Sequence, residues 1–275
     1  TVNYTLFDIP RLKQKFIHVH PGAEELGRVY QGDLLINSGM PEFAAAARAL
    51  EPVKRAWDDW TQGARADLEA WQQPVQVPGK VNMSEVIHFL RAKLPKDAII
   101  TNGAGNFSLW AHRFYQYGGF RTQLAPTSGA MGYGVPAAVA AKIIHPERTV
   151  VAFAGDGDFL MTGQELATAA QYDAKVLFIV VNNGMYGTIR MHQEREFPGR
   201  VSGTMLKNPD FAALARAYGF HGETVEATAD FQGAFERAQA AKGSALIEVR
   251  IDPEAINPRT TLSAIRAEAM KTKGK

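Results

Sequence analysis

Short apolar runs alternate with helical patterns along most of the chain. Runs rich in β-branched residues indicate strands, and longer segments with an apolar stripe indicate helices. This alternation is typical of βαβ units, so we expect an α/β fold, a doubly wound parallel sheet with helices on both faces. The predicted strands cover 97–103, 149–155, 175–183 and 244–251, and the predicted helices cover 82–94, 129–144, 161–172, 208–220 and 229–241.

A smaller group of similar elements precedes this sheet. Strands are expected at 15–21 and 33–40, and helices at 22–30 and 41–54. Two strands and two helices cannot cover both faces of a sheet. We therefore expect this segment to be the end of a second α/β domain whose other strands lie before Thr1, and the chain to be a fragment.

The composition changes between the two groups. Residues 55–73 resemble a helix and carry three tryptophans, and Pro74, Pro78 and Gly79 interrupt the pattern after them. We expect four parts. They are a partial α/β domain at 1–54, a helical connector with a linker at 55–80, the main domain at 81–252 and a charged, mobile tail at 253–275.

Charge and cysteine content exclude several classes of protein. The 275 residues include 30 Lys and Arg, 28 Asp and Glu, and no cysteine. Disulfide scaffolds, thiolate zinc sites, iron-sulfur clusters and cysteine nucleophiles are excluded. The net charge of +2 leaves no basic surface for nucleic acid beyond the tail at 271–275. There is no apolar run of about 18 residues and no signal peptide, so we expect a cytoplasmic protein that does not enter a membrane.

Two motifs follow buried strands. The strand at 149–155 is apolar on both faces, and Asp156 follows it. The chain continues through a helix, with Thr162 and Glu165 at capping-box spacing, and returns along a strand that ends in an Asn pair containing Asn183. Because a right-handed crossover places both strand ends at one edge, Asp156 and Asn183 are expected to face each other across one crevice.

The residues at this edge predict a particular ligand. A carboxylate, a carboxamide oxygen and backbone carbonyls suit Mg²⁺, with phosphate oxygens and water completing its shell. The glycines around Asp156 allow close approach, and the start of a helix favours an anion. We therefore predict a metal-bridged diphosphate.

A purely structural interpretation of each motif also exists. The sequence Gly-Asp-Gly is a common tight turn, and Asn-Asn-Gly is a strong hairpin signal, so residues 180–189 could form a hairpin without a ligand. A hairpin needs antiparallel strands, however, whereas this region alternates strand and helix. The two motifs together favour the binding site.

The combination resembles a known family. Gly-Asp-Gly followed by a helix and a strand ending in Asn-Asn is similar to the diphosphate-binding signature of the thiamine-diphosphate-dependent enzymes. Residues 101–115 and 127–141 resemble the corresponding stretches of acetolactate synthase-like members, and the likeness extends over 81–251. Residues 16–36 resemble the end of the middle domain of the same enzymes.

The resemblance implies roles for individual residues. The Mg²⁺ ligands would be Asp156, Asn183 and the backbone carbonyl of Met185. The diphosphate would meet the backbone around Gly155, Gly157, Asp158, Tyr186 and Gly187.

Further positions lie where the family contacts the rest of the cofactor. Asn106 and Phe107 stand where acetolactate synthases carry Gln-His near the diphosphate, so a side-chain contact there is an open question. Met131 would be the apolar wedge that bends the cofactor, although it could also be a core residue at a helix start. The carbonyl of Gly129 would accept from the aminopyrimidine.

Substrate recognition differs from that of the acetolactate synthases. His192 stands where those enzymes carry a tryptophan in the acceptor pocket, and a solvated helix histidine is an equally good interpretation. Three arginines could meet an anionic substrate or belong to a solvated face: Arg190, Arg195 and Arg200.

The activity implied is that of a thiamine-diphosphate and Mg²⁺-dependent lyase or transferase that decarboxylates or carboligates a small 2-oxo acid, working as a homodimer or homotetramer. The family activates its cofactor with a Glu from the N-terminal domain of a partner subunit, and no segment here matches that domain. Glu165 is explained by its capping-box position. We therefore expect no catalytic residue in this chain and no activity from it alone. Whether the middle domain binds FAD is left open.

Three alternatives stay open. The protein could be another 2-oxo acid decarboxylase or C-C lyase of this family, or a cofactor-binding module without catalysis. A nicotinamide dehydrogenase is suggested by Gly103 and Gly105, but Ser108 stands at the third glycine position and no acidic residue follows about 20 positions on.

Overall fold

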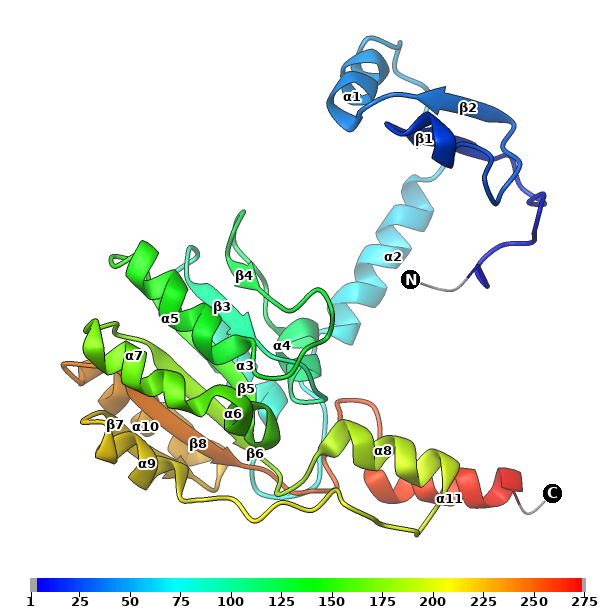
Figure 1. The fold of residues 1–275 in the computed structure, drawn as a ribbon. Coiled ribbons are helices and arrows are strands. Elements are labelled where there is room, and N and C mark those ends of the chain that lie inside the picture. Colours follow the sequence, from blue (N-terminus) through cyan, green and yellow to red (C-terminus); the bar gives the residue numbers. More distant parts are fainter. Residues whose placement is uncertain (1–3, 274–275) are drawn as a thin grey trace. The chain divides into compact units, whose positions relative to one another are not determined.

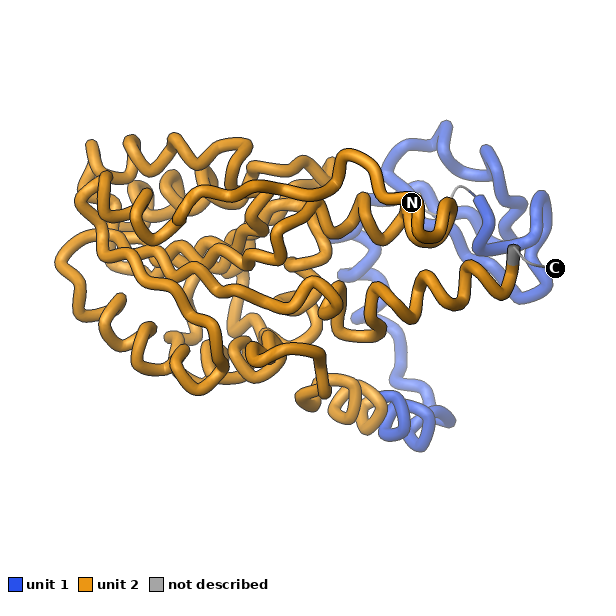
Figure 2. The backbone as a smooth tube through the Cα atoms, turned by 90° about the horizontal axis from the view of Figure 1, so that it is seen from below, with its two compact units in different colours: residues 1–64 blue, residues 65–275 orange. Residues whose placement is uncertain are grey.

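A computed structural model describes residues 4–273 and divides the chain into two compact units, residues 1–64 and 65–275 (Figure 2). The division falls inside helix α2 (Asp58–Trp71), within the predicted connector at 55–80. The described residues do not include Thr1, where the predicted fragment begins, or the last two residues of the predicted tail. No helix in the described part of the chain is both long and apolar enough to cross a membrane.

Unit 1 contains the two predicted strands in parallel pairing. Strand β1 (Ile17–His20) pairs with β2 (Leu34–Asn37), and helix α1 (Met40–Arg48) follows. The predicted helix at 22–30 is wrong, because the structure has only a 3-10 turn at Ala23–Glu25. The chain turns extended at Leu26, and Gly27 takes a φ of +75°, which a helix cannot contain. The apolar run at 15–21 suggests a buried strand, but β1 is only partly buried, and Ile17 is 58% exposed.

Unit 2 is built on a six-stranded, fully parallel sheet with the order β4-β3-β5-β6-β8-β7 (Figure 1). The predicted doubly wound fold is confirmed. Two edge strands, β4 and β7, were missed, because β4 has two residues and β7 is polar and only partly buried. The strands are β3 (Ile99–Asn102), β4 (Gln123–Leu124), β5 (Val150–Gly155), β6 (Leu177–Asn182), β7 (His221–Val225) and β8 (Ala245–Arg250).

Helices cover both faces of this sheet. Alternate strand residues point to opposite sides, so Val151 and Phe153 pack against α3, α4 and α10, whereas Ala152 and Ala154 pack against α5, α6, α7 and α9. The helices are α3 (Met83–Lys93), α4 (Ser108–Phe114), α5 (Gly134–Ile144), α6 (Asp156–Thr162), α7 (Leu166–Gln171), α8 (Gly187–Glu196), α9 (Phe211–Ala217), α10 (Thr228–Ala240) and α11 (Leu262–Lys273).

The starts of two predicted helices differ from the structure. Helix α5 begins at Gly134 rather than 129, because Gly129 and Gly132 take φ values of +67° and +84°. The predicted capping box is wrong. Helix α6 begins directly at Asp156, the Thr162 hydroxyl donates to the Gly132 carbonyl, and the Glu165 carboxylate accepts from Thr168.

The predicted mobile tail is wrong over the described residues. Residues Leu262–Lys273 form helix α11, which lies beside α8 (Figure 1). Leu262 and Ile265 are buried in a small separate core with Met185, Met191 and Ile256. Glu268 and Lys271 are exposed, whereas Arg266 reaches back to Glu194 on α8, and this charged composition is why a tail was expected.

Candidate functional site

The crevice lies where the sheet changes direction. From β3 the chain passes to β4 on one side, and then returns to β5 on the other side of β3. The loops that follow β3 and β5 therefore diverge, and such a switch point at the carboxyl ends of the strands is the usual ligand site of an open α/β sheet.

A pocket opens at this point. Most of the predicted site residues line it, including Asp156 and Asn183 from neighbouring strands. Gly129 and His192 do not line it, and His192 lies exposed on α8. The lining consists of Ala104, Gly105, Asn106, Phe107, Trp110, Met131, Gly155, Asp156, Gly157, Asp158, Val181, Asn183, Met185, Tyr186, Gly187, Thr188, Ile189, Ile251, Ala255 and Ile256.

Asp156 joins the two predicted motifs. Its side chain is buried, and Oδ2 accepts from the backbone N–H of Gly184 at 2.9 Å while Oδ1 accepts from that of Gly157 at 3.0 Å. Burial raises the pKa of this carboxyl, against the lowering effect of its hydrogen bonds. The carboxylate is thus held at the ends of β5 and β6, and an adjacent cation would favour its ionised form.

The loop after β6 is not a hairpin. β6 pairs in parallel with β5 and β8, and α8 begins at Gly187. The carboxamide oxygen of Asn183 accepts from the backbone N–H of Met185 at 3.2 Å, which curls the loop into an Asx turn. Asn183 and Met185 therefore come to the pocket from one tight loop.

Asn208 is a site residue that the sequence did not indicate. Its Nδ2 donates to Asp156 Oδ2 at 2.7 Å and to Asn182 Oδ1 at 2.9 Å. Its position before Pro209 and helix α9 favours a capping role, so no sequence signal points to a contact 52 residues away. Asn208 Oδ1 is buried and has no hydrogen-bond partner among the described residues.

Asp158 connects the loops on the other side of the switch point. Its Oδ1 accepts from the backbone N–H of Gly132 at 2.8 Å and from that of Ala104 at 3.2 Å, whereas Oδ2 is buried without a partner. A Cβ on Gly103 would lie 1.9 Å from Oδ1, so only glycine fits there. Burial raises the pKa of Asp158 to about 6.

We expect Asp158→Asn to stabilise the metal-free protein at neutral pH. A raised carboxyl pKa means that stability is greatest below the ordinary value of 3.8 and falls as the pH rises through about 6. The amide removes this loss, so the gain should be about 3 kcal/mol at pH 7 and close to zero at pH 3.5. Urea unfolding at both pH values, with Asp67→Asn on the surface of α2 as control, measures it. An equal gain at both values would contradict the charge argument.

Asn106 and Phe107 both line the pocket, but the side chain of Asn106 is already engaged. Its Oδ1 accepts from the Thr188 hydroxyl at 3.0 Å, and its Nδ2 contacts Met191 Sδ at 3.5 Å. Phe107 lies against Gly155, where a Cβ would come within 2.6 Å of its ring. These contacts tie the loop after β3 to α8.

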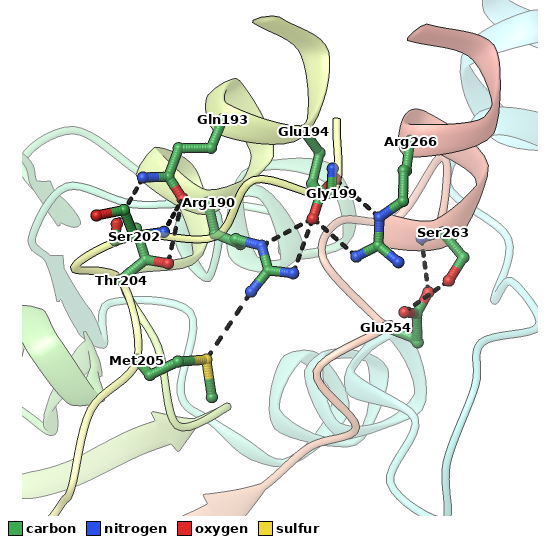
Figure 3. Close-up of polar contacts among 10 residues, drawn as sticks. All are labelled: Arg190, Gln193, Glu194, Gly199, Ser202, Thr204, Met205, Glu254, Ser263 and Arg266. Atoms are coloured by element: carbon green, nitrogen blue, oxygen red, sulfur yellow. Dashed lines mark hydrogen bonds and ion pairs between the residues drawn. The ribbon is translucent and has the colours of Figure 1, made fainter. Parts of the chain in front are cut away.

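The three predicted arginines differ in their surroundings. Arg195 and Arg200 are exposed, whereas Arg190 is 7% exposed and pairs with Glu194 on the next turn of α8 (Figure 3). A solvated face is therefore wrong for Arg190. Glu194, which the sequence reasoning missed, is buried at 1% exposure and also pairs with Arg266.

The donor set at this pocket fits Mg²⁺ better than a softer metal. No group of three or more His, Cys, Asp or Glu side chains that could hold a metal occurs among residues 4–273. An ion here would depend on Asp156, the Asn183 carboxamide and the Met185 carbonyl, all hard oxygen donors at the pocket, together with oxygens of a ligand. Asp158, which also lines the pocket, adds the buried, unpartnered Oδ2 as a further oxygen.

Comparison with known proteins gives a family match over this region. The family described as "Thiamine pyrophosphate enzyme, C-terminal TPP binding domain" matches residues 103–249, which is more than half of the chain and includes both motifs. The pattern of the nicotinamide alternative, Gly103 to Ser108, falls inside the matched segment, so that alternative has no remaining support.

Individual relatives agree with this match. An acetolactate synthase of Arthrospira platensis is 39% identical over 56% of this chain and 27% of its own length, and the acetolactate synthase isozyme 2 large subunit of Escherichia coli is 29% identical over 86% and 43%. A thiamine diphosphate-dependent 4-hydroxybenzoylformate decarboxylase of Rhodococcus jostii has a similar structure, with a TM-score of 0.70 and 29% identity over 86% of this chain and 44% of its own. The chain thus spans less than half the length of each.

Proposed function

Because the chain belongs to the thiamine pyrophosphate enzymes through their C-terminal TPP binding domain, we propose that the pocket at the switch point binds thiamine diphosphate with Mg²⁺, and that the whole protein acts on a 2-oxo acid. The observation that carries the proposal is the hydrogen bond between Asp156 and Gly184. It joins the carboxylate after β5 to the loop of amide and carbonyl oxygens after β6 within one pocket.

Different residues of the pocket are proposed to bind the metal and the diphosphate. Asp156, Asn183 and the Met185 carbonyl are proposed to hold the metal. The backbone around Gly155, Gly157, Asp158, Tyr186 and Gly187 would face the diphosphate. Glycine at 157 also leaves room for the Tyr186 ring, which a Cβ there would approach to 2.6 Å.

The rest of the cofactor is proposed to lie along the apolar part of the lining. Met131 offers a flexible apolar side chain at the pocket, and Gly129 lies two residues before it in the same loop. Both the side chain and the backbone N–H of Asn106 are hydrogen bonded to Thr188, so Asn106 is proposed to line the pocket by packing alone. Phe107, Met131 and Ile256 exclude water from this wall.

When bound, thiamine diphosphate supplies an electron sink for the carbanion that decarboxylation of a 2-oxo acid leaves behind. The residues of this chain would hold and orient the cofactor and shield the reacting carbon from water. The relatives are named as an acetolactate synthase and a 4-hydroxybenzoylformate decarboxylase, and for this protein we propose either carboligation or decarboxylation of a 2-oxo acid.

The carboxylate that activates the cofactor is proposed to come from outside the described residues. Both carboxyl groups of the lining, Asp156 and Asp158, are held by backbone N–H groups at the diphosphate end. Glu165 is hydrogen bonded to Thr168 and does not line the pocket. The engagement of both lining carboxyl groups in this way also suits a second candidate function, a cofactor-binding module without catalysis.

An oligomer is proposed from the surface beside the pocket. Tyr133, Leu160 and Met161 are large apolar side chains with exposed fractions of 38%, 43% and 46%. Tyr133 follows Gly132 in the chain and Met161 packs against Gly132, next to the pocket residue Met131, and a second copy in a homodimer or homotetramer would cover this surface.

Calorimetric titration of the 275-residue protein with thiamine diphosphate tests the proposal. We expect binding that requires Mg²⁺ and disappears when EDTA removes the ion, because the diphosphate and the protein oxygens share one cation. The same preparation should leave pyruvate unconsumed. Absence of binding at any Mg²⁺ concentration would refute the cofactor site, whereas pyruvate consumption would refute the external carboxylate.

A further inference from the structure

Glu194 is a buried carboxylate that the proposed reaction does not use. It is surrounded by five hydrogen-bond donors (Figure 3). Oε1 accepts from Arg190 Nε and Nη2 at 3.0 and 2.7 Å and from Arg266 Nη2 at 2.7 Å. Oε2 accepts from Arg266 Nε at 2.8 Å and from the backbone N–H of Gly199 at 2.9 Å. One side chain therefore ties α8 to α11 and to the turn after α8.

The segment that starts at this turn runs back to the proposed metal loop. Gln193, beside Glu194, donates to the Ser202 carbonyl at 2.6 Å. Further along, the backbone N–H of Tyr186 donates to Thr204 O and that of Leu206 donates to Gly184 O, both at 2.9 Å. The loop that contains Asn183 and Met185 is thus held from outside by residues 199–206.

The C-terminal part of the chain reaches the pocket from the other direction. Ala255 and Ile256 line the pocket, and Ile256 packs with Met185 in the small core that α11 closes through Leu262 and Ile265. A second contact fixes the start of α11, because the Glu254 carboxylate accepts from the backbone N–H and the hydroxyl of Ser263, both at 2.8 Å (Figure 3).

We infer that Glu194 is a positioning residue that couples helix α11, through Arg266, to the loop at Gly184–Tyr186, so that the C-terminal helix holds the cofactor loop in its binding conformation. The charges around Glu194 support this coupling. Two guanidinium groups share one carboxylate, so Glu194 stays ionised and both arginines depend on it. For its effect on the cofactor, the inference rests on the proposed function.

Replacing Arg266 with methionine tests the coupling, because it leaves Glu194 paired with Arg190 and removes only the link to α11. Amide hydrogen exchange without cofactor should become about tenfold faster or more at Tyr186 and Leu206, while amides of β5 keep their rates. Lys271→Met, an exposed cation on the same helix, is the matched control and should change neither. Arg266→Lys should restore part of the protection.

Binding of thiamine diphosphate with Mg²⁺, measured by calorimetry on the same variants, should weaken about tenfold for Arg266→Met and less for Arg266→Lys. Unchanged exchange at Tyr186 and Leu206, or equally faster exchange throughout unit 2, would overturn the coupling whatever the binding result. If the unmodified protein does not bind the cofactor, the proposed function fails, and the exchange rates still decide the coupling separately.

Discussion

Asp156→Ala is expected to abolish Mg²⁺-dependent binding of thiamine diphosphate, reducing affinity by at least about 100-fold. Asp156 is the only one of the three proposed ligands that carries a charge. Its loss also removes the hydrogen bonds that the carboxylate accepts from Gly184 and Asn208, which then keep only their bonds to Asn182 Oδ1, so Asp156 no longer links the two loops. Titration calorimetry at fixed Mg²⁺ measures the loss.

Two variants separate this effect from a loss of folding. Asp156→Asn keeps an acceptor for Gly184 but lacks the charge, so it should fold and bind only weakly. Asp67→Ala removes an exposed aspartate from α2 and should bind as the unmodified protein does. Circular dichroism and thermal unfolding establish that each variant is folded. Affinity within twofold of the original in a folded Asp156→Ala protein would refute the metal site.

The second large effect is expected from Glu194→Ala, which should lower the free energy of unfolding by about 3–5 kcal/mol. The variant leaves Arg190 buried at 7% exposure without a counter-charge, and it removes the acceptor for Gly199. Replacing Glu194 and Arg190 together with methionine should cost less, because no buried charge remains unpaired. Urea unfolding measures both, with the exposed Glu236→Ala on α10 as control.

The same carboxylate gives this stability a pH dependence. Hydrogen bonds from Arg266 are the largest cause that lowers the pKa of Glu194 from 4.5 to about 2. A lowered carboxyl pKa contributes stability above the unfolded value of 4.5 and loses it as the pH falls towards 2, a change of about 3 kcal/mol. The difference between the original protein and Glu194→Gln should therefore shrink between pH 5 and pH 2. A difference that stays constant over this range would show that Glu194 does not act through its charge.

The local pattern of apolar residues was sufficient to predict the inner strands of the unit 2 sheet. Buried strands such as 150–155 are apolar on both faces because helices cover both sides of a parallel sheet, and this is visible in sequence. The handedness of the crossover then places Asp156 and Asn183 at one edge, so the central pair of the site followed from chain order. The cap of helix α3 is local in the same sense, because the Asn82 side chain accepts from the Ser84 N–H two residues on.

The support of that pair, in contrast, depends on contacts between segments far apart in the chain. Asn208 reaches Asp156 across 52 residues, and Arg266 reaches Glu194 across 72. Such contacts have no period and no fixed spacing, because they depend on where whole elements pack. Helix α11 was mistaken for a tail for the same reason, since its few apolar side chains find a core only against α8 and Ile256. Local patterns in the sequence were therefore enough for the four inner strands of the sheet and for the residue pair at their edge, whereas the two edge strands and the contacts that hold the pair depend on the packing of distant segments.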